Sequence, residues 1–461
     1  MPADPATSTA AAPEAAGNAL LRGLLDVMRG TSDRHNAQRN ALFVFLVRAA
    51  SAGILYLSQV ILARWMGAAD YGIYVWVWTL VLVLGGISHL GLGPSLMRLI
   101  PAYRETGQMD LLRGLLIGSR WLAFVGGSIV SITAYWFLRT FAFEIPDTYL
   151  LPAMLGTVCI PLFALTDLQD GLGRAKGWMA IALVPPYVLR PLALLSMMAL
   201  AHLAGLPVDA ITVTFGAIIA CWAASFVQTL MVQRRIDEII PPGPRVYAFG
   251  PWIRSSLPLL AIYASELVLQ NADVLVLSAH LPPQQIGMYF AAGKTMALVM
   301  FVHYAVGSAT VKDFAALHAR GDTSALETHI RDAAKWTFWP SLAAALAILA
   351  LGKPLLWLFS PSFVDAYPVM LVLAAGFLFS AAVGPAEFLL NALGEQKICA
   401  AVAIFAALLD IMLNLLLVPD FGMIGAATAT ATALASAAIL NAWAARRRIG
   451  FDISILQLLR R

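Results

Sequence analysis

Long apolar stretches separated by short polar segments recur along the chain from about residue 41 to residue 445. Each holds about 20 residues, the length that an α-helix needs to cross the hydrocarbon core of a bilayer. The pattern predicts an all-α integral membrane protein with about twelve transmembrane helices. The predicted spans are 41–63, 73–97, 115–138, 149–168, 178–203, 210–232, 255–280, 287–309, 336–352, 368–392, 399–418 and 424–445.

The composition agrees with this prediction. Of the 461 residues, 60% are hydrophobic and only 12% are charged, whereas soluble domains are about one quarter charged. The three cysteines, Cys159, Cys221 and Cys399, all fall inside predicted spans, so the sequence shows neither a disulfide framework nor a zinc-ligand spacing. We therefore expect no metal and no cofactor.

The placement of charge predicts the orientation of the chain. With the N-terminus inside, most of the 30 Lys and Arg residues fall on the cytoplasmic side, as the positive-inside rule requires. Both termini are therefore predicted to be cytoplasmic. Residues 1–40 are expected to form a disordered tail and a short amphipathic helix, which either lies in the membrane interface or caps the first span. Residues 447–461 are expected to form a cytoplasmic tail.

The chain also carries an internal repeat. The segment "YGIYVWVWTLVLVLG" matches "IGMYFAAGKTMALVM", which places Gly72 opposite Gly287. Repeats with an even number of spans are parallel, an arrangement found in transporters that bind substrate between two lobes. We predict two parallel six-helix lobes joined by a charged, proline-rich cytoplasmic linker. Their predicted bounds are 41–232 and 253–446, with the linker at 233–252.

Lys294 lies in "AAGKTM", which looks like the end of a phosphate-binding P-loop. That motif needs a glycine at position 288, but the residue is Met288, and the lysine lies inside an apolar span rather than after a strand. Asp273 lies at a similar predicted depth on the preceding span. Because an unpaired charge in the membrane is costly, two interpretations stay open: an ion pair between Asp273 and Lys294, or a cavity cation that meets an anionic headgroup.

Arg190 lies near the middle of the fifth predicted span, in the proline-rich segment "PPYVLRP". Prolines free backbone groups of a helix, and broken helices of this kind line cavities. A guanidinium at this depth either binds a phosphate with two parallel hydrogen bonds or has a structural partner. By the repeat, its counterpart in the second half lies at or next to Asp410, so the two opposite charges are candidates for a gate.

Further charges inside the predicted spans complete the candidate sites. Arg48 and Arg120 lie near the inner face, where each either snorkels to headgroups or extends a path for an anion. Glu266 shares a helix face with Asp273, and the two either bind a coupling ion or make helix–helix contacts. The candidate substrate-binding residues are Arg48, Arg120, Arg190 and Lys294. The candidate ion-coupling or gating residues are Glu266, Asp273 and Asp410.

Some polar residues in the spans need no functional explanation. His89 and His303 are interpreted as structural histidines. Asp167, Asp170 and Glu387 fall near the inner ends of their predicted spans, where solvation suffices.

Several segments carry a resemblance to a known family. They include "ILARWMGAADYGIYVWVW", "NADVLVLSAHLPPQQIGMYFAAGK" and "LDIMLNLLLVPDFGMIGAATATATA". Together they resemble Wzx-type polysaccharide flippases of the multidrug/oligosaccharidyl-lipid/polysaccharide exporter superfamily, over about residues 40–450. The resemblance implies a multi-pass transporter of the bacterial inner membrane that flips undecaprenyl-diphosphate-linked oligosaccharide from the cytoplasmic to the periplasmic leaflet. It also implies alternating access coupled to an ion gradient, in lipopolysaccharide or exopolysaccharide biosynthesis.

The implied partners are the lipid-linked oligosaccharide, the membrane, and a polysaccharide polymerase with its export machinery, and no nucleic acid. One alternative is a small-molecule or drug antiporter of the same superfamily, which the cationic residues in the spans disfavour. Another is an enzyme, a membrane glycosyltransferase or polymerase. Such an enzyme needs paired carboxylates in a periplasmic loop, whereas the predicted external loops are short and offer only scattered aspartates, Asp147, Asp209, Asp365 and Asp420. We therefore expect a transporter rather than an enzyme.

Overall fold

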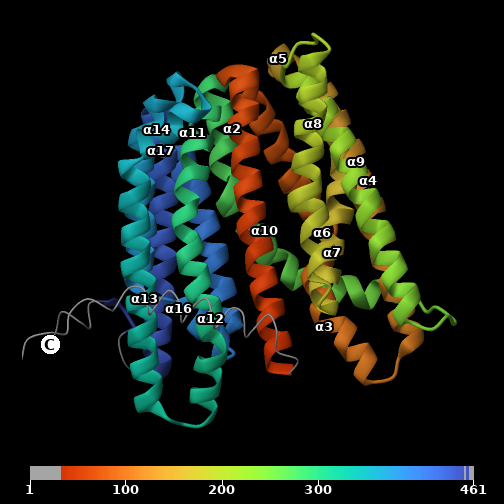
Figure 1. Ribbon diagram of the computed structural model, residues 1–461, viewed down its shortest axis with the longest axis vertical. Coiled ribbons are helices and arrows are strands. Elements are labelled where there is room, and N and C mark those ends of the chain that lie inside the picture. Colours follow the sequence, from red (N-terminus) through yellow and green to blue (C-terminus); the bar gives the residue numbers. More distant parts are fainter. Residues whose placement is uncertain (1–32, 451–452, 456–461) are drawn as a thin grey trace, which may run out of the picture. The chain divides into compact units, whose positions relative to one another are not determined.

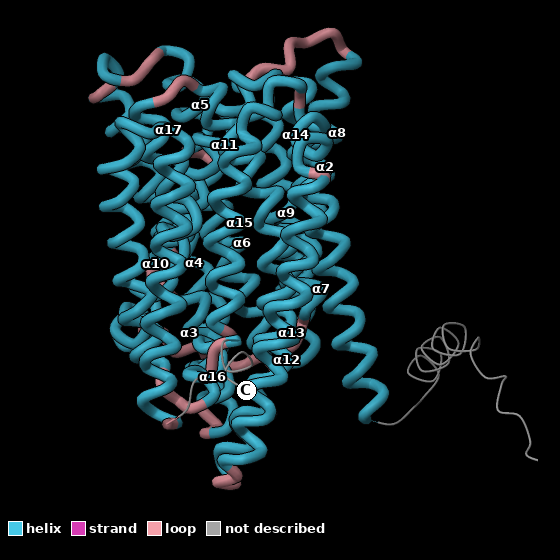
Figure 2. The backbone as a smooth tube through the Cα atoms, turned by 90° about the vertical axis from the view of Figure 1, so that its left-hand side faces the viewer, coloured by secondary structure: helices cyan, strands magenta, loops and turns pink. Residues whose placement is uncertain are grey.

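The computed structural model describes residues 33–450 and 453–455, and side chains from residue 50 onwards except that of residue 144. Over these residues the chain is helical and holds no strand (Figure 1). The tube view shows the same result, with loops only at the helix ends (Figure 2). The predicted N-terminal tail and amphipathic helix lie outside the described residues. The predicted all-α membrane class is confirmed.

Two helices are long enough to cross a bilayer twice. They are α2 (Asp33–Ser88) and α17 (Gln396–Ile449). Each contains one glycine with non-helical backbone angles, Gly67 with φ 79° and Gly422 with φ 55°. A positive φ is readily available only to glycine, so the chain turns at these residues. Both glycines lie between predicted spans, and they separate the first span from the second and the eleventh from the twelfth.

Nine helices in the described part of the chain are long and apolar enough to cross a membrane, and a bent pair, α5 (Asp147–Gly156) with α6 (Cys159–Lys176), brings the number to ten. If α2 and α17 each count as two spans, the number agrees with the predicted twelve. The number of spans and their sidedness remain predictions.

In the first half of the chain, α6 packs on α3, α4 and α9, α3 also packs on α4, and α8 packs on α9. The predicted break at the prolines before Arg190 is a π-helical turn, η2 (Pro185–Leu189), inside an otherwise continuous span. The remaining helices of this half are α3 (Leu92–Glu105), α4 (Met109–Thr140), η1 (Ala142–Glu144), α7 (Met179–Val184), α8 (Arg190–Leu203) and α9 (Ala210–Ile239).

In the second half, α10 and α15 pack on α17, and α12 packs on α13. Helix α10 also packs on α3, so it contacts both halves of the chain. The helices of this half are α10 (Phe249–His280), α11 (Pro283–Met296), η3 (Ala297–Val299), α12 (Met300–Ala319), α13 (Thr323–Ala350), α14 (Gly352–Phe359), η4 (Pro361–Ala366), α15 (Tyr367–Val383) and α16 (Ala386–Ala392).

The predicted linker, 233–252, contains a non-helical segment. Helix α9 continues to Ile239 and α10 begins at Phe249, so only 240–248 is not helical. Three prolines and no apolar periodicity keep this segment extended. Arg113 of α4 holds it by donating from Nε to the carbonyl of Pro241 at 2.9 Å.

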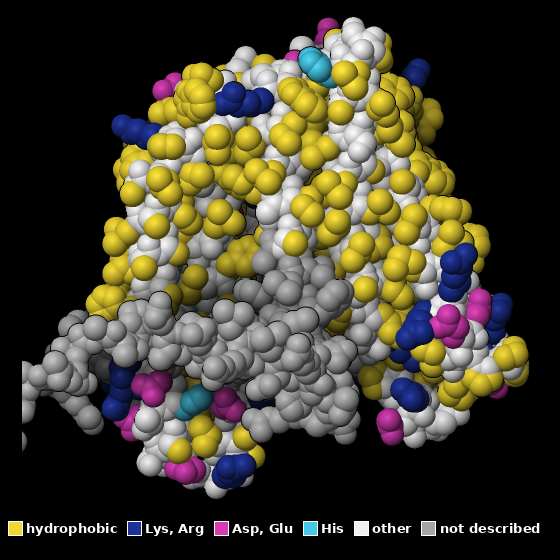
Figure 3. Space-filling view, viewed as in Figure 1, with side chains coloured by type: hydrophobic (Ala, Val, Ile, Leu, Met, Phe, Trp, Pro, Cys, Tyr) yellow, Lys and Arg dark blue, Asp and Glu magenta, His cyan; other side chains and the backbone are white. Residues whose placement is uncertain are grey.

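The outer surface of the helices is strongly apolar. On α4, for example, Trp121, Ile129 and Trp136 are 62%, 61% and 60% exposed. Apolar side chains cover the middle of the face shown in Figure 3, and charged side chains gather toward its two ends. An apolar band between charged ends is the surface that a bilayer requires. The chain is a multi-pass membrane protein.

Candidate functional site

Arg190 is held by aromatic rings rather than by a carboxylate. It begins α8, directly after the π-helical turn, and its guanidinium carbon lies 4.9 Å from the centre of the Trp78 ring and 5.6 Å from that of Phe163. No hydrogen bond or ion pair joins Arg190 to another residue in the described part of the chain. The rings attract the face of the guanidinium, which leaves the N–H groups on its edge available to a ligand.

Lys294 does not form the predicted contact pair with Asp273. Its Nζ lies over the ring of Phe290, 4.8 Å from the centre. The Asp273 carboxylate instead accepts a hydrogen bond of 2.6 Å from the hydroxyl of Tyr289, in α11. No ion pair joins Lys294 to Asp273 in the described part of the chain, and the other interpretation, a cavity cation that meets an anionic headgroup, stays a prediction.

Lys294 is an exposed residue within a predicted span. Its ammonium group lies against the Phe290 ring, and the flanking residues Ala292 and Thr295 are buried. A methyl group built on the neighbouring Gly293 would meet no atom within 4 Å. This combination is expected of a residue that lines an internal cavity, where a charged ligand can approach the ammonium group.

Asp410 lies in a second polar cluster, between α10 and the two arms of α17. Asp410 is fully buried, and neither of its carboxylate oxygens has a hydrogen-bond partner among the residues that the structure describes. Asn414 and Thr430 are also buried, and each presents a side-chain oxygen without a partner. The Asn414 side-chain amide donates to the backbone carbonyl of Asp410 at 2.9 Å, and Thr430 and Asp273 lie near the Asp410 carboxylate.

Buried acceptors without donors are costly, and four side chains rich in oxygen around one place are typical of a cation site. Asn414 and Thr430 were not among the predicted site residues. Asn414 lies one helical turn after Asp410, so helical spacing was a signal for it. Thr430 follows the Gly422 turn, and only the packing of the two arms places it here. The opposite charges of Arg190 and Asp410 are not in contact with each other in this structure.

Glu266 is exposed although it lies inside a predicted span. On the same face of α10, Gln270 is exposed and Asp273 is half-buried. Glu266 and Glu387 of α16 lie close enough to repel each other. Glu266, Asp273 and Glu387 make this face of α10 acidic, and Asp273 connects it to the Asp410 cluster.

Arg120 and Arg48 are the two remaining candidate cations. Arg120 donates from Nη2 to Gln233 Oε1 at 2.7 Å and from Nε to the carbonyl of Leu116 at 2.9 Å. The bond to Gln233 joins α4 to α9, the bond to Leu116 lies within α4, and together they use part of the donor capacity of Arg120, as a structural role requires. Arg48 lies in α2, and its side chain is outside the described residues.

The two halves of the chain touch at the predicted periplasmic end. The Tyr56 hydroxyl lies 3.1 Å from Thr295 Oγ1. Because Thr295 already donates to the carbonyl of Ala291, Tyr56 is the donor. Arg64 donates from Nε to the carbonyl of Leu358 at 2.6 Å, at the C-terminal end of α14.

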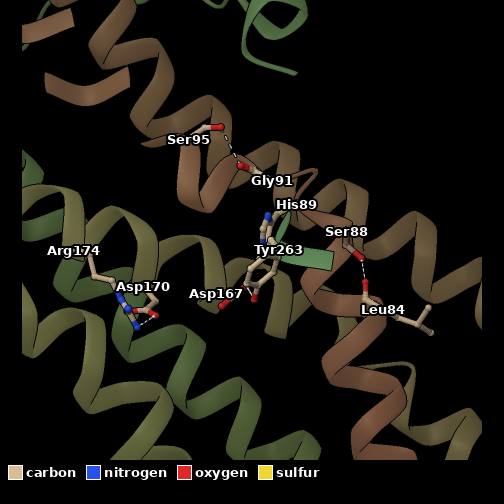
Figure 4. Close-up of polar contacts among 9 residues, drawn as sticks. All are labelled: Leu84, Ser88, His89, Gly91, Ser95, Asp167, Asp170, Arg174 and Tyr263. Atoms are coloured by element: carbon tan, nitrogen blue, oxygen red, sulfur yellow. Dashed lines mark hydrogen bonds and ion pairs between the residues drawn. The ribbon is translucent and has the colours of Figure 1, made fainter. Parts of the chain in front are cut away.

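Sequence reasoning missed a polar contact at the other end. His89 Nε2 lies 2.9 Å from Asp167 Oδ2, and the Tyr263 hydroxyl lies 2.7 Å from the same oxygen (Figure 4). Asp167 was expected to be a solvated residue, but it accepts two hydrogen bonds from protein groups. The three residues are far apart in the sequence, and no local spacing signals that they meet.

The sequence matches models of two known protein families. A family model described as "Polysaccharide biosynthesis protein" matches residues 37–311, more than half of the chain. This chain belongs to that family. A second model, MatE, matches residues 258–416. The predicted resemblance to flippases of the multidrug/oligosaccharidyl-lipid/polysaccharide superfamily is therefore confirmed.

One curated relative is the probable low-salt glycan biosynthesis flippase Agl15 of Haloferax volcanii, 24% identical over 171 residues. The match covers 37% of this chain and 36% of that protein, so the chain spans about a third of the length of the relative it matches.

Two solved structures share the fold. One is an inward-facing multidrug resistance MATE family transporter of the MOP superfamily, with a TM-score of 0.71 and 15% identity, covering 87% of this chain and 94% of that one. The other is the lipid II flippase MurJ in an inward closed conformation, with a TM-score of 0.70 and 16% identity, covering 91% of both chains.

Proposed function

We propose that this protein flips a diphosphate-linked oligosaccharide lipid, with undecaprenol as the carrier, from the cytoplasmic to the periplasmic leaflet of a bacterial inner membrane. The observation that carries the proposal is the pair of intramembrane cations, Arg190 and Lys294, each held against aromatic rings and neither in contact with a carboxylate. The family and the Haloferax volcanii flippase support the substrate class.

The energetics favour an anionic ligand at Arg190. A charged side chain at the centre of a membrane costs at least about 2.5 kcal/mol. Contact with an aromatic face returns about 2 kcal/mol where water is excluded, so Trp78 and Phe163 offset much of the cost of the charge. They do not satisfy the guanidinium N–H groups. A diphosphate accepts those hydrogen bonds in pairs, whereas a neutral or cationic drug does not.

The Asp410 cluster supports coupling to a cation. Asp273, Asp410, Asn414 and Thr430 place two carboxylates and two neutral oxygens around one buried place. A bound Na⁺ or H⁺ would relieve both the unpaired acceptors and the repulsion between the carboxylates. Because the site lies between α10 and α17, its occupancy would change how these helices pack, which is the requirement for a coupling ion.

The test is a flipping assay in proteoliposomes with a fluorescent oligosaccharide-diphosphate-polyprenol. We expect Arg190→Ala to lower the initial flipping rate at least tenfold. Arg235→Ala is the control, because Arg235 forms a surface ion pair with Glu238 at the end of α9. If Arg190→Ala flips the lipid as fast as the unaltered protein, the anion path is wrong.

A drug antiporter is the second candidate. The MatE match over residues 258–416 and the exposed Glu266 favour it, because an acidic cavity binds organic cations. The same proteoliposomes separate the two functions. Extrusion of a cationic dye that depends on Glu266, without flipping of the lipid, would support the antiporter and reject the flippase.

A further inference from the structure

The second span bends sharply just inside its predicted cytoplasmic end. Helix α2 ends at Ser88 and α3 begins at Leu92, and between them Leu90 and Gly91 have φ values of 54° and 72°. The imidazole of His89 at this bend is fully buried. Because the carboxylate of Asp167 can only accept, His89 Nε2 carries the proton of the bond between them. His89 Nδ1 has no partner within the described residues.

The bend is pressed against α10, a helix of the second half. A methyl group on Gly91 would lie 2.6 Å from the backbone nitrogen of Leu260 and from the carbonyl oxygen of Ser256. Only glycine permits so close an approach. The contact brings the Tyr263 ring to 5.5 Å from the His89 ring, centre to centre, and its hydroxyl to Asp167.

One carboxylate oxygen therefore joins three elements. His89 of the α2–α3 bend and Asp167 of α6 belong to the first half of the chain, whereas Tyr263 of α10 belongs to the second (Figure 4). Asp167 has no ion pair with Lys or Arg in the described part of the chain. The nearby Arg174 binds Asp170 instead, with hydrogen bonds of 2.9 and 2.7 Å.

We propose that Asp167 is a latch that holds the two halves of the chain together at the predicted cytoplasmic end. The proposal rests on the proposed transport function, since alternating access requires this end to open. Of the two bonds to Asp167, only the one from Tyr263 crosses between the halves. Closer to its N-terminus, α10 is also joined to α3 by Trp252 Nε1, which donates to the Tyr103 hydroxyl at 3.0 Å, and by Arg98 Nη2, which donates to the carbonyl of Ser255 at 3.5 Å. His89 is a positioning residue, because it stays with Asp167 when α10 moves away and keeps the same oxygen turned toward Tyr263.

The strength of the latch follows from its charge and surroundings. Hydrogen bonds to an ionised carboxylate are about twice as strong as neutral ones, and Asp167 is only 21% exposed. When α10 separates from the first half, water can hydrogen-bond to the Asp167 carboxylate, but the Tyr263 hydroxyl loses its acceptor. Removal of the tyrosine hydroxyl abolishes this penalty, while the aromatic ring still packs on His89.

The experiment measures a distance across the predicted cytoplasmic end. Spin labels are attached at Thr106→Cys, in the first half, and Thr323→Cys, in the second, both at exposed positions. The native cysteines are buried, so they do not take the label. Pulsed dipolar spectroscopy in nanodiscs then reports the populations of short and long distances.

We expect Tyr263→Phe to lower the ratio of closed to open populations about tenfold, which corresponds to about 1.4 kcal/mol. Asp167→Asn keeps one acceptor without the charge, so its ratio should lie between those of Tyr263→Phe and the unaltered protein. The control is Tyr135→Phe, a tyrosine on the outer face of α4. The distance distribution of Tyr135→Phe should match that of the unaltered protein.

An unchanged distribution in Tyr263→Phe would overturn the latch. The spectroscopy needs no substrate, so the latch and the proposed function fail separately. If Arg190→Ala flips lipid normally while Tyr263→Phe opens the protein, the substrate proposal is wrong and the latch stands.

Discussion

Gly72 and Gly287, which occupy equivalent positions in the two copies of the internal repeat, lie against each other in the folded chain. A methyl group on Gly287 would lie 3.2 Å from the backbone nitrogen of Gly72, and one on Gly72 would lie 1.7 Å from the carbonyl oxygen of Pro283. The second span and the eighth therefore touch backbone to backbone where each begins. Small residues permit this approach between membrane helices. The contact closes the halves of the chain together at the end opposite the Asp167 latch.

We predict that Gly72→Ala destabilises this closed end. A carbonyl oxygen at 1.7 Å cannot be accommodated by a side-chain rotation, so α11 must move away from α2. Overpacking of this kind costs about 1–3 kcal/mol. The apparent melting temperature in detergent should fall by several degrees. The matched control is Gly293→Ala, where the added methyl group meets no atom within 4 Å. Equal melting of Gly72→Ala and the unaltered protein would contradict the close contact.

A charge swap tests the relation between Lys294 and Asp273. Because Asp273 bonds Tyr289 and adjoins Asp410, whereas Lys294 lies over the Phe290 ring, each charge belongs to a different environment. We expect Asp273→Lys with Lys294→Asp to flip lipid no better than the weaker single variant. Recovery to more than half of the native rate in the double variant would show that the two residues act as an ion pair.

Asp410→Asn should remove the response of the protein to its coupling cation. The asparagine preserves size but cannot supply a negative charge at the buried site. We expect Na⁺, or acid if the ion is H⁺, to raise the melting temperature of the unaltered protein but not that of the variant. Asp420→Asn is the control, because Asp420 is exposed in the same helix. A full cation response in Asp410→Asn would exclude this cluster as the ion site.

Arg190→Lys should be nearly as defective in flipping as Arg190→Ala. The charge is kept, but an ammonium group has no planar face to lie against Trp78 and Phe163 and cannot form two parallel bonds to a phosphate. We expect a rate at least tenfold below native in the proteoliposome assay. Near-native flipping by the lysine variant would mean that charge alone, without the guanidinium geometry, is sufficient at this position.

The twelve apolar stretches, the repeat and the intramembrane charges could all be recognised from the sequence because each depends on local composition. The turns at Gly67 and Gly422 fall where the apolar stretches are interrupted. Asp410 and Lys294 were found because a charge inside an apolar span is conspicuous on its own. The repeat also paired Gly72 with Gly287, although nothing in the alignment required the two to touch.

Which side chain meets which depended on helix packing. Equal depth suggested that Lys294 pairs with Asp273, but the packing of the helices places Lys294 over the Phe290 ring and lets the Asp273 carboxylate accept from Tyr289. The same reason hid the bonds from His89 and Tyr263 to Asp167. The amino-acid sequence thus determined the membrane class, the helices and the charges that must be compensated, because burial in lipid acts on each segment separately. Only the tertiary structure decided their partners, because the rotation and crossing of helices are set by contacts between residues far apart in the chain.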